Sequence, residues 1–360
     1  MPRVSDILEA IGRIAPHHEA YPWDKIGLQV GDPSVEVGRV LVTLDASRAA
    51  IREAAAGSQM IVAHHPVIWE PLARLDGSYS ASRAVELARH SIALAVAHTN
   101  WDCARGGVND ALAARIGLRD VRPVGRGAQP ECLKLTVTVP KVHTQAVLDA
   151  IAAAGAGQIG AYRRCAFWAA GKGTFQPMEG ANPRVGSVGS IENVEEDRLE
   201  AVLERGLRTA VEEAVLQSHP YEVPAYDFHE VSVHGTALAR IGELERPMAA
   251  ADFARHVGNR LGGPTIGYGS TDVRLVVVVG GAGGDYWRLA LDADAAFVTG
   301  EAKHHEGLEA AEAGTTLVAA GHYATEQPGV EALRNALATQ LPEVEFRAFT
   351  PEPGQAGRPQ

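Results

Sequence analysis

The sequence predicts an α/β fold with a mostly parallel sheet, interrupted by an inserted α+β domain. Short apolar runs typical of buried strands alternate with segments whose apolar residues recur at helical spacing. Histidine and acidic residues directly follow several of these runs, at the strand ends where open α/β sheets bind ligands. The middle of the chain, residues 128–235, has a different order of elements and no cluster of such residues. We therefore expect a discontinuous core formed by residues 1–127 and 236–360.

Length, charge and composition narrow the class of protein. The chain has 360 residues, more than one typical domain, and its net charge of −11 without a concentrated Lys/Arg stripe argues against direct binding of nucleic acid. No apolar run approaches a membrane span, and the amino terminus lacks a signal-peptide pattern. The cysteines, which show no paired spacing, are Cys103, Cys132 and Cys165. We expect a cytoplasmic protein in a reducing compartment, with no membrane association and no CxxC zinc site.

The first half of the core alternates between helices and strands. Residues 4–14 carry apolar side chains at helical spacing, with Ser5 and Asp6 near the start, and predict an amphipathic helix. The elements expected after it are a turn into a strand at 23–31, a strand at 39–44, a helix at 47–56, a strand at 60–63, a helix at 80–90 and a strand at 92–97. Pro66 takes the chain out of the sheet, because proline cannot continue a central strand.

The last third of the chain continues this alternation. Strands are expected at 274–279, 295–299 and 315–320, with a helix after each of the last two. Pro328 is tolerated in the first turn of the final helix. The glycine-rich run 280–284 has two possible roles: its backbone N–H groups could cradle a phosphate, or it could form a tight turn from strand to helix. It matches neither the dinucleotide-binding nor the P-loop spacing.

Histidine and acidic residues follow four expected strands at the same end. In a parallel sheet these carboxyl ends lie on one edge, so residues far apart in sequence can meet there. The candidate metal ligands are His64, His65, Asp102, His322 and Glu326. Three imidazoles and two carboxylates without a thiolate suit Zn, Mn, Fe, Co or Ni. Five ligands fit two divalent ions about 3.5–4 Å apart that share a bridging carboxylate.

Four further polar residues stand beside these ligands in the sequence. We expect His98 and Glu301 to be catalytic, as proton donor and acceptor, and His304 and His305 to contact the substrate or cofactor. Alternatively, these residues position the metal ligands without binding the metal or the substrate. The two adjacent histidines could also simply form an exposed helix start. The histidines interpreted as structural or surface residues are His17, His18, His219, His229 and His234.

The inserted segment predicts a ferredoxin-like unit. Its expected elements are a strand at 133–139, a helix at 144–154, strand-like stretches around 163–170, a charged helix at 195–218 and a strand at 226–233. A Gly/Pro-rich loop at 171–189 separates its two halves. Packing or oligomerisation is one possible role of this unit, and a lid or a sensor of small molecules is another.

Six segments resemble the NIF-three-like family (NGG-one-interacting-factor-three-like proteins). They are Trp-Asp-Lys-Ile-Gly-Leu-Gln-Val-Gly at 23–31, Ala-His-His-Pro at 63–66, His-Thr-Asn-Trp-Asp at 98–102, Gly-Gly-Ala-Gly-Gly at 280–284, Gly-Glu-Ala-Lys-His-His at 300–305 and Gly-His-Tyr-Ala-Thr-Glu at 321–326. The insert is similar to that of the longer bacterial members through Cys-Ala-Phe at 165–167, Gly-Lys-Gly-Thr-Phe at 171–175 and the acidic run at 191–198. Glu301 departs from the family pattern, where Asp is expected, but an acidic group remains.

This resemblance implies a dinuclear metal centre ligated by the five residues named above, with Glu326 as the bridging ligand. It further implies a ring-shaped homohexamer whose sites face an internal cavity, and an insert similar to signalling proteins of the PII and CutA type. Many members are called GTP cyclohydrolase I type 2 homologues, which implies hydrolytic ring opening of GTP.

Two classes of function follow. The first is a metal-dependent hydrolase that acts on a nucleotide or a related small molecule, with a phosphoesterase as a variant. The second is a non-catalytic metal-binding scaffold or regulator. Family likeness alone does not decide between them, because one fold hosts many functions.

Overall fold

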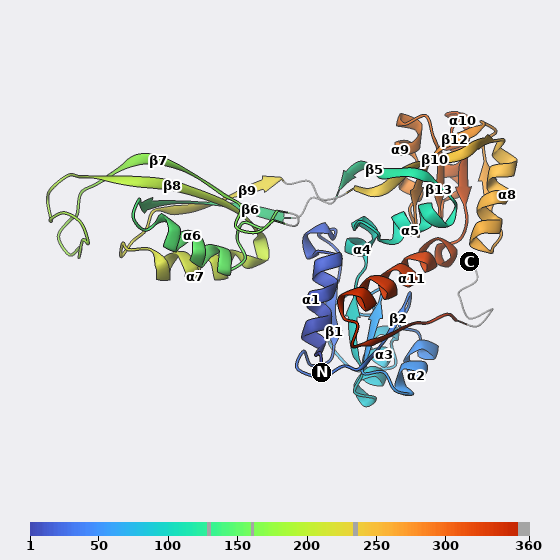
Figure 1. The fold of residues 1–360 in the computed structure, drawn as a ribbon, viewed down its shortest axis with the longest axis horizontal. Coiled ribbons are helices and arrows are strands. Elements are labelled where there is room, and N and C mark those ends of the chain that lie inside the picture. Colours follow the sequence, from blue (N-terminus) through green and yellow to red (C-terminus); the bar gives the residue numbers. More distant parts are fainter. Residues whose placement is uncertain (128–130, 160–161, 233–236, 352–360) are drawn as a thin grey trace. The chain divides into compact units, whose positions relative to one another are not determined.

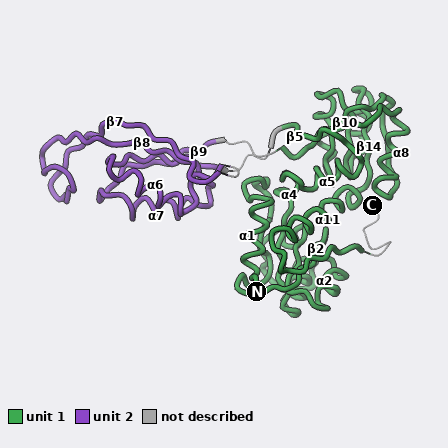
Figure 2. Tube along the Cα trace, viewed as in Figure 1, with its two compact units in different colours: residues 1–128, 234–360 green, residues 129–233 purple. Residues whose placement is uncertain are grey.

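The computed structural model describes residues 1–127, 131–159, 162–232 and 237–351. The chain divides into two compact units (Figure 2). Unit 1 consists of residues 1–128 and 234–360, and unit 2 consists of residues 129–233. Unit 1 contains every residue predicted to form the metal centre.

The first sheet of unit 1 has the strand order β1-β4-β3-β2-β15. Figure 1 labels β1 and β2 of this sheet. Its strands are β1 (Gly27–Val30), β4 (Ala93–Val96), β3 (Met60–Ala63), β2 (Arg39–Thr43) and β15 (Glu345–Ala348). Only β1 runs antiparallel to its neighbour, β4. Alternate side chains point to opposite faces. Leu41 and Ile61 pack against α2 (Arg48–Ala55) and α3 (Tyr79–Arg89), whereas Val42 and Val62 pack against α1 (Val4–Ile14) and α11 (His322–Gln340).

The second sheet of unit 1 has the order β11-β14-β13-β12-β10-β5. Its strands are β11 (Ile266–Tyr268), β14 (Leu317–Ala319), β13 (Ala296–Thr299), β12 (Val273–Val279), β10 (Ala237–Met248) and β5 (Arg119–Gly127). Its two faces pack against α5 (Val108–Arg115) with α8 (Ala250–Leu261), and against α9 (Arg288–Asp292) with α10 (His304–Glu312). The helix α11 contacts both α1 and α5. The shorter helices of this unit are α4 (Thr99–Cys103) and the 3₁₀ turns η1 (His17–Glu19) and η3 (Gly284–Tyr286).

The prediction of a mostly parallel sheet is wrong, because the sheets are mixed. In the second sheet only the β12–β13 and β13–β14 pairs are parallel, and β5, β10 and β11 pair antiparallel. The strand β5 leads into unit 2 and β10 leads out of it, so the two lie side by side in opposite directions without a crossover helix. The expected single sheet edge is therefore replaced by the strand ends of two separate sheets.

Unit 2 is one antiparallel sheet covered by two helices. Its elements are β6 (Glu131–Pro140), α6 (Thr144–Ala153), β7 (Ala166–Phe175), β8 (Glu192–Glu204), η2 (Arg205–Leu207), α7 (Arg208–Ser218) and β9 (Tyr226–Ser232). The strand order is β7-β8-β6-β9. Leucines and valines of β6 and β8 form its core with Val147 and Ile151 of α6 and Val211 and Val215 of α7.

The predicted charged helix at 195–218 is wrong in its first half. Residues 192–204 form β8, residues 205–207 form the 3₁₀ turn η2, and only Arg208–Ser218 are α-helical. Along β8, Leu199, Ala201 and Leu203 are buried and alternate with the half-buried residues Glu200 and Val202, which is the period of a strand. Pairing with β6 on one side and β7 on the other overrides the helical preference of the charged residues. Among the described residues, no helix is both long and apolar enough to cross a bilayer.

Candidate metal centre

The first sheet places two histidines at the end of its central strand. Every side chain of β3 is buried, and the strand runs directly into His64 and His65. The backbone N–H groups of these histidines donate to Thr43 O and Leu44 O, both at 2.9 Å, so the register of β3 with β2 continues through them. Pro66 then ends the pairing. Both imidazoles are therefore fixed by the sheet.

Two helix starts supply the other candidate ligands. Asp102 lies in α4, which begins shortly after the end of β4 at Val96. Its backbone N–H donates to His98 O at 3.0 Å. His322 and Glu326 are four residues apart at the start of α11 and face the same side of it. Gly321, at φ +90°, allows the abrupt turn from β14 into this helix. The ligands thus come from both sheets of unit 1.

The four imidazoles are held in the same way. His64 Nδ1 lies 2.9 Å from the carbonyl oxygen of Ala97. The other three rings bring Nδ1 to a carboxylate oxygen, His65 to Asp45 at 2.9 Å, His98 to Asp24 at 2.8 Å and His322 to Glu301 at 3.1 Å. Because a carbonyl or carboxylate oxygen only accepts, each Nδ1 carries the hydrogen and each Nε2 is left to bind elsewhere. Metal-ligating histidines show this arrangement.

Glu326 lies between these Nε2 atoms. Its Oε2 is 2.9 Å from His322 Nε2 and 3.1 Å from His65 Nε2, and the two nitrogens are 3.3 Å apart. Its other oxygen, Oε1, is 3.9 Å from His64 Nε2, which also lies 3.5 Å from Asp102 Oδ1. One carboxylate therefore faces imidazoles on both of its oxygens, the geometry required of a bridging ligand.

Two atoms of the cluster are buried without a hydrogen-bond partner. They are His64 Nε2 and Glu326 Oε2, on side chains that are 2% and 6% exposed. Leaving a buried polar atom unpaired costs about 1–3 kcal/mol, so such atoms need a specific reason. Lone pairs of nitrogen and oxygen that face one another repel unless a positive charge lies between them. A divalent cation fits this donor set.

The electrostatics of the cluster indicate the same need for positive charge. Burial lowers the pKa of His64 to about 3, so this imidazole is neutral and its Nε2 can bind a cation. Burial also acts to lower the pKa of His65, but the hydrogen bond to Asp45 and the nearby carboxylate of Glu326 outweigh it and raise the pKa to about 10. Burial and the nearby Glu326 raise the pKa of Asp102 well above its ordinary value. A metal ion would take the place of the proton that the cluster otherwise attracts.

Two overlapping groups of side chains could each hold an ion. His64, His65 and His98 offer ligand atoms within 4.8 Å of one another, and so do His65, His322 and Glu326. His65 is common to both groups. The structure thus places His98 among the possible ligands, besides its predicted role in proton transfer.

Asp24 supports His98 through a contact that the sequence did not indicate. Its side chain is fully buried, accepts from His98 Nδ1 at 2.8 Å and from Thr99 N at 2.9 Å, and also accepts from the Thr99 hydroxyl. Burial acts to raise the pKa of Asp24, but these hydrogen bonds outweigh it and lower the pKa below its ordinary value. An ionised Asp24 therefore fixes both the orientation and the tautomer of His98. Asp24 and His98 are 74 residues apart, and no sequence pattern links them.

Four predicted site residues lie outside these two groups, and one of them, Asp102, still lies beside the cluster, 3.5 Å from His64 Nε2. Glu301 is mostly exposed and accepts from His322, so it supports a ligand in this structure. His304 and His305 are exposed at the start of α10, where the His304 ring lies 6.2 Å from the ring of Tyr268. Their contact with a substrate or cofactor stays a prediction.

The glycine-rich run forms a tight turn behind Glu326. The N–H groups of Gly280, Gly281 and Gly283 donate to Asn109 Oδ1, Thr325 Oγ1 and Thr299 Oγ1 at 2.7, 3.1 and 3.1 Å. These three amides are therefore not free to cradle a phosphate. A Cβ built on Gly281, at φ +62°, would lie 2.0 Å from Glu326 Oε1. The glycine leaves room for the carboxylate.

Replacing Gly281 by alanine is expected to displace Glu326 and weaken metal binding about 10- to 100-fold. The added methyl group clashes with Oε1, and the left-handed backbone adds about 1–2 kcal/mol of strain. Metal per chain after dialysis, measured by atomic emission, checks this. Gly314→Ala is the matched control, since Gly314 has φ +87° and no neighbour within 4 Å of a built Cβ. Equal metal content in both variants would contradict the assignment of Glu326.

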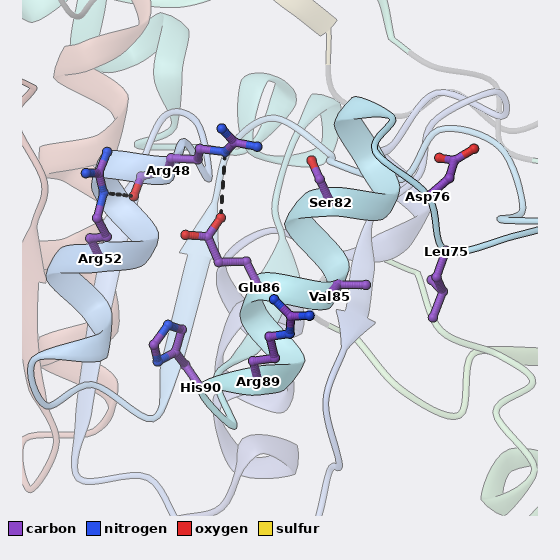
Figure 3. Close-up of a pocket in the computed structure, with 9 residues that line it drawn as sticks. All are labelled: Arg48, Arg52, Leu75, Asp76, Ser82, Val85, Glu86, Arg89 and His90. Atoms are coloured by element: carbon purple, nitrogen blue, oxygen red, sulfur yellow. Dashed lines mark hydrogen bonds and ion pairs between the residues drawn. The ribbon is translucent and has the colours of Figure 1, made fainter.

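A hollow of about 710 Å³ lies elsewhere in unit 1, between α2 and α3 (Figure 3). Arg48, Arg52 and Arg89 line it, and Arg48 Nε lies 3.9 Å from the Glu86 carboxylate. None of the predicted site residues lines it. This hollow is therefore not part of the candidate metal centre.

Asp45 also supports a candidate ligand, and unlike Asp24 it could have been found from the sequence. It lies two residues beyond the carboxyl end of β2, as His65 lies two residues beyond the end of β3, and it accepts from His65. The rule that identified the ligands therefore applies to it as well.

Comparison with known proteins covers nearly the whole chain. The sequence model of the family described as Duf34/NIF3 (NGG1p interacting factor 3) matches residues 2–353. A Halalkalibacterium halodurans protein named GTP cyclohydrolase 1 type 2 homolog is 37% identical over 324 residues, 88% of this chain and 87% of that protein. A Bacillus subtilis protein of the same name is 38% identical over 326 residues, with the same coverage.

Solved structures show the same likeness. A Bacillus cereus protein related to NIF3 superimposes with a TM-score of 0.73 and 33% identity over 98% of each chain. A Staphylococcus aureus protein gives a TM-score of 0.73 and 26% identity over 99% of this chain and 98% of that one.

Proposed function

This chain belongs to the Duf34/NIF3 family, and from that premise we propose that it is a dinuclear metal-dependent hydrolase of a nucleotide or a related small molecule. The observation that carries the proposal is the convergence of three Nε2 atoms on the two oxygens of Glu326, with Asp102 beside them. Two relatives bear the name GTP cyclohydrolase 1 type 2 homolog, which makes a purine nucleotide the first substrate to test.

In this proposal His64, His65, Asp102, His322 and Glu326 hold two divalent ions, drawn from Zn, Mn, Fe, Co or Ni. Ions at such a site lower the pKa of water and withdraw electron density from a substrate oxygen. The protein positions the ligands through the acceptors on each Nδ1, so that the rings do not reorganise during the reaction.

His98 is the residue best placed to move a proton. Its Nδ1 donates to Asp24, which leaves Nε2 facing the other imidazoles. The ring centroids of His64 and His65 lie 5.1 and 5.6 Å from that of His98. A histidine held by a buried carboxylate in this way serves as a general acid or base.

The fold type of unit 2 and the oligomeric state of the protein are also proposals. The β-α-β-β-α-β order of residues 129–233, with sheet order β7-β8-β6-β9, supports a ferredoxin-like domain. The homohexamer implied by the family is checked by sedimentation of the purified protein.

The test of the proposed function is turnover by metal-loaded protein. Metal content is measured first, and the protein is then assayed against GTP, other nucleotides and a phosphodiester such as bis-(p-nitrophenyl) phosphate. We expect hydrolysis that is lost in Asp102→Ala and Glu326→Ala. Bound metal without turnover of any of these compounds would favour the non-catalytic scaffold instead.

A further inference from the structure

We propose that Trp23 and Trp69 form a stacking platform that binds a planar heteroaromatic ring of the substrate beside the metal centre. The inference rests on the proposed function and deepens it, since it names the part of the substrate that is recognised and the residues that recognise it. The expected ring is a purine base.

The two indoles are part of a row of stacked rings. The Trp23 and Trp69 centroids lie 6.2 Å apart with an angle of 26° between the ring planes, and Tyr21 stacks on Trp23 at 5.9 Å and 26°. Trp23 is 56% exposed and Trp69 is 42% exposed. Trp69 stands at the end of this row, and bases stack readily on an exposed aromatic face of this kind.

The row meets the metal centre at His98. The His98 ring contacts both indoles edge-on, with centroids 6.3 Å from Trp23 and 5.7 Å from Trp69. The same ring lies 5.1 Å from His64. A ring stacked on the indoles is therefore separated from the metal ligands by one imidazole, the group proposed to move the proton.

The backbone segments that carry Trp23 and Trp69 are held together by the side chain of one residue, Gln29. Gln29 Oε1 accepts from Val67 N at 3.0 Å and Ile68 N at 2.9 Å, next to Trp69. Gln29 Nε2 donates to Ile68 O at 3.0 Å and to Lys25 O at 3.1 Å, two residues from Trp23. Both exposed indoles are thus pre-organised, which reduces the entropy lost when a ligand binds.

The chemistry of the surroundings favours a base over other ligands. The platform itself is apolar, whereas the adjacent cluster of Asp and Glu carboxylates would repel a phosphate until metal is bound. A heteroaromatic ring combines a face that stacks on indole with polar edges that can reach His98 or the metal centre. Purines fit this pair of requirements.

The test measures binding of guanosine, a nucleoside without phosphate, by titration calorimetry to metal-loaded protein. Trp69→Leu keeps an apolar side chain but removes the ring, and Trp69→Phe keeps a ring. Trp168→Leu removes an indole that is 48% exposed in unit 2. We expect Trp69→Leu to weaken guanosine binding about 5- to 150-fold, since stacking on an aromatic residue accounts for a factor of this size. Trp69→Phe should retain most of the affinity, and Trp168→Leu all of it, with metal content unchanged in all three.

Three results would overturn the platform. They are equal guanosine affinity in Trp69→Leu and the unsubstituted protein, no guanosine binding by the unsubstituted protein, and a changed sedimentation coefficient in Trp69→Leu, which would place the indoles in a subunit contact. Failure of the platform and of the proposed function are distinguishable. Turnover that requires Asp102 but not Trp69 leaves the hydrolase standing, whereas guanosine binding that requires Trp69 in a protein without turnover leaves only the platform.

Discussion

Glu326→Gln is expected to reduce metal binding more than about 100-fold and to abolish turnover. The substitution preserves the volume of the side chain but removes its negative charge. One oxygen becomes an NH₂ group, which cannot ligate a metal and would point toward either His64 or the pair of His65 and His322. Because both carboxylate oxygens face imidazoles, neither orientation of the amide preserves the site. Metal per chain, measured after dialysis against buffer that has been treated with a chelating resin, checks this.

Glu331→Gln is the matched control for this variant. Glu331 lies on the same helix, is exposed and pairs with Arg115 at 2.7 Å. Loss of an exposed ion pair changes stability by only about 0–1 kcal/mol and should leave metal binding intact. Two ions per chain in Glu326→Gln, at the affinity of the control, would rule out a bridging role for this carboxylate.

Asp24→Asn is expected to lower the turnover rate about 10²- to 10⁴-fold. Asp24 accepts from His98 on one oxygen and from Thr99 N–H on the other. An asparagine cannot accept on both atoms. If its oxygen faces Thr99, its NH₂ group forces His98 Nδ1 to become an acceptor, and the proton moves to Nε2. The histidine then presents the wrong tautomer to the metal centre.

The metal content of Asp24→Asn also separates the two roles open to His98. Retention of both ions with slow turnover supports proton transfer, and loss of one ion identifies His98 as a ligand. Asp32→Asn is the control, because Asp32 is an exposed acid whose hydrogen bonds are to Ser34. Full activity and full metal content in Asp24→Asn would show that Asp24 does not position His98.

The candidate ligands could be predicted from the sequence, but the way in which they meet could not. His64 and His65 follow an apolar run, and His322 and Glu326 open a helix after another, so their placement at strand ends is a local property. The direction of β10 and β5, and the division into two sheets, depend on pairing between distant segments, which local patterns do not record.

Hydrogen bonds between residues distant in sequence likewise could not be predicted from the sequence. The contact between Asp24 and His98 spans 74 residues, and the clamp of Gln29 on Ile68 spans 39. Neither Asp24 nor Gln29 belongs to a sequence pattern that reveals its partner. The strand at 192–204 was missed for a related reason, since its charged residues favour a helix and only its two neighbouring strands impose the extended form.

The sequence alone determined which atoms are available for chemistry, because residue type and position relative to a strand end are local features. Tertiary structure decided which of those atoms share a site, and it brought Glu326 between imidazoles from two sheets. It also selected the nitrogen of each imidazole that faces the centre, through acceptors on Nδ1. The physical reason is that lone-pair direction and burial are properties of the packed chain, and they set the affinity of the site for a cation.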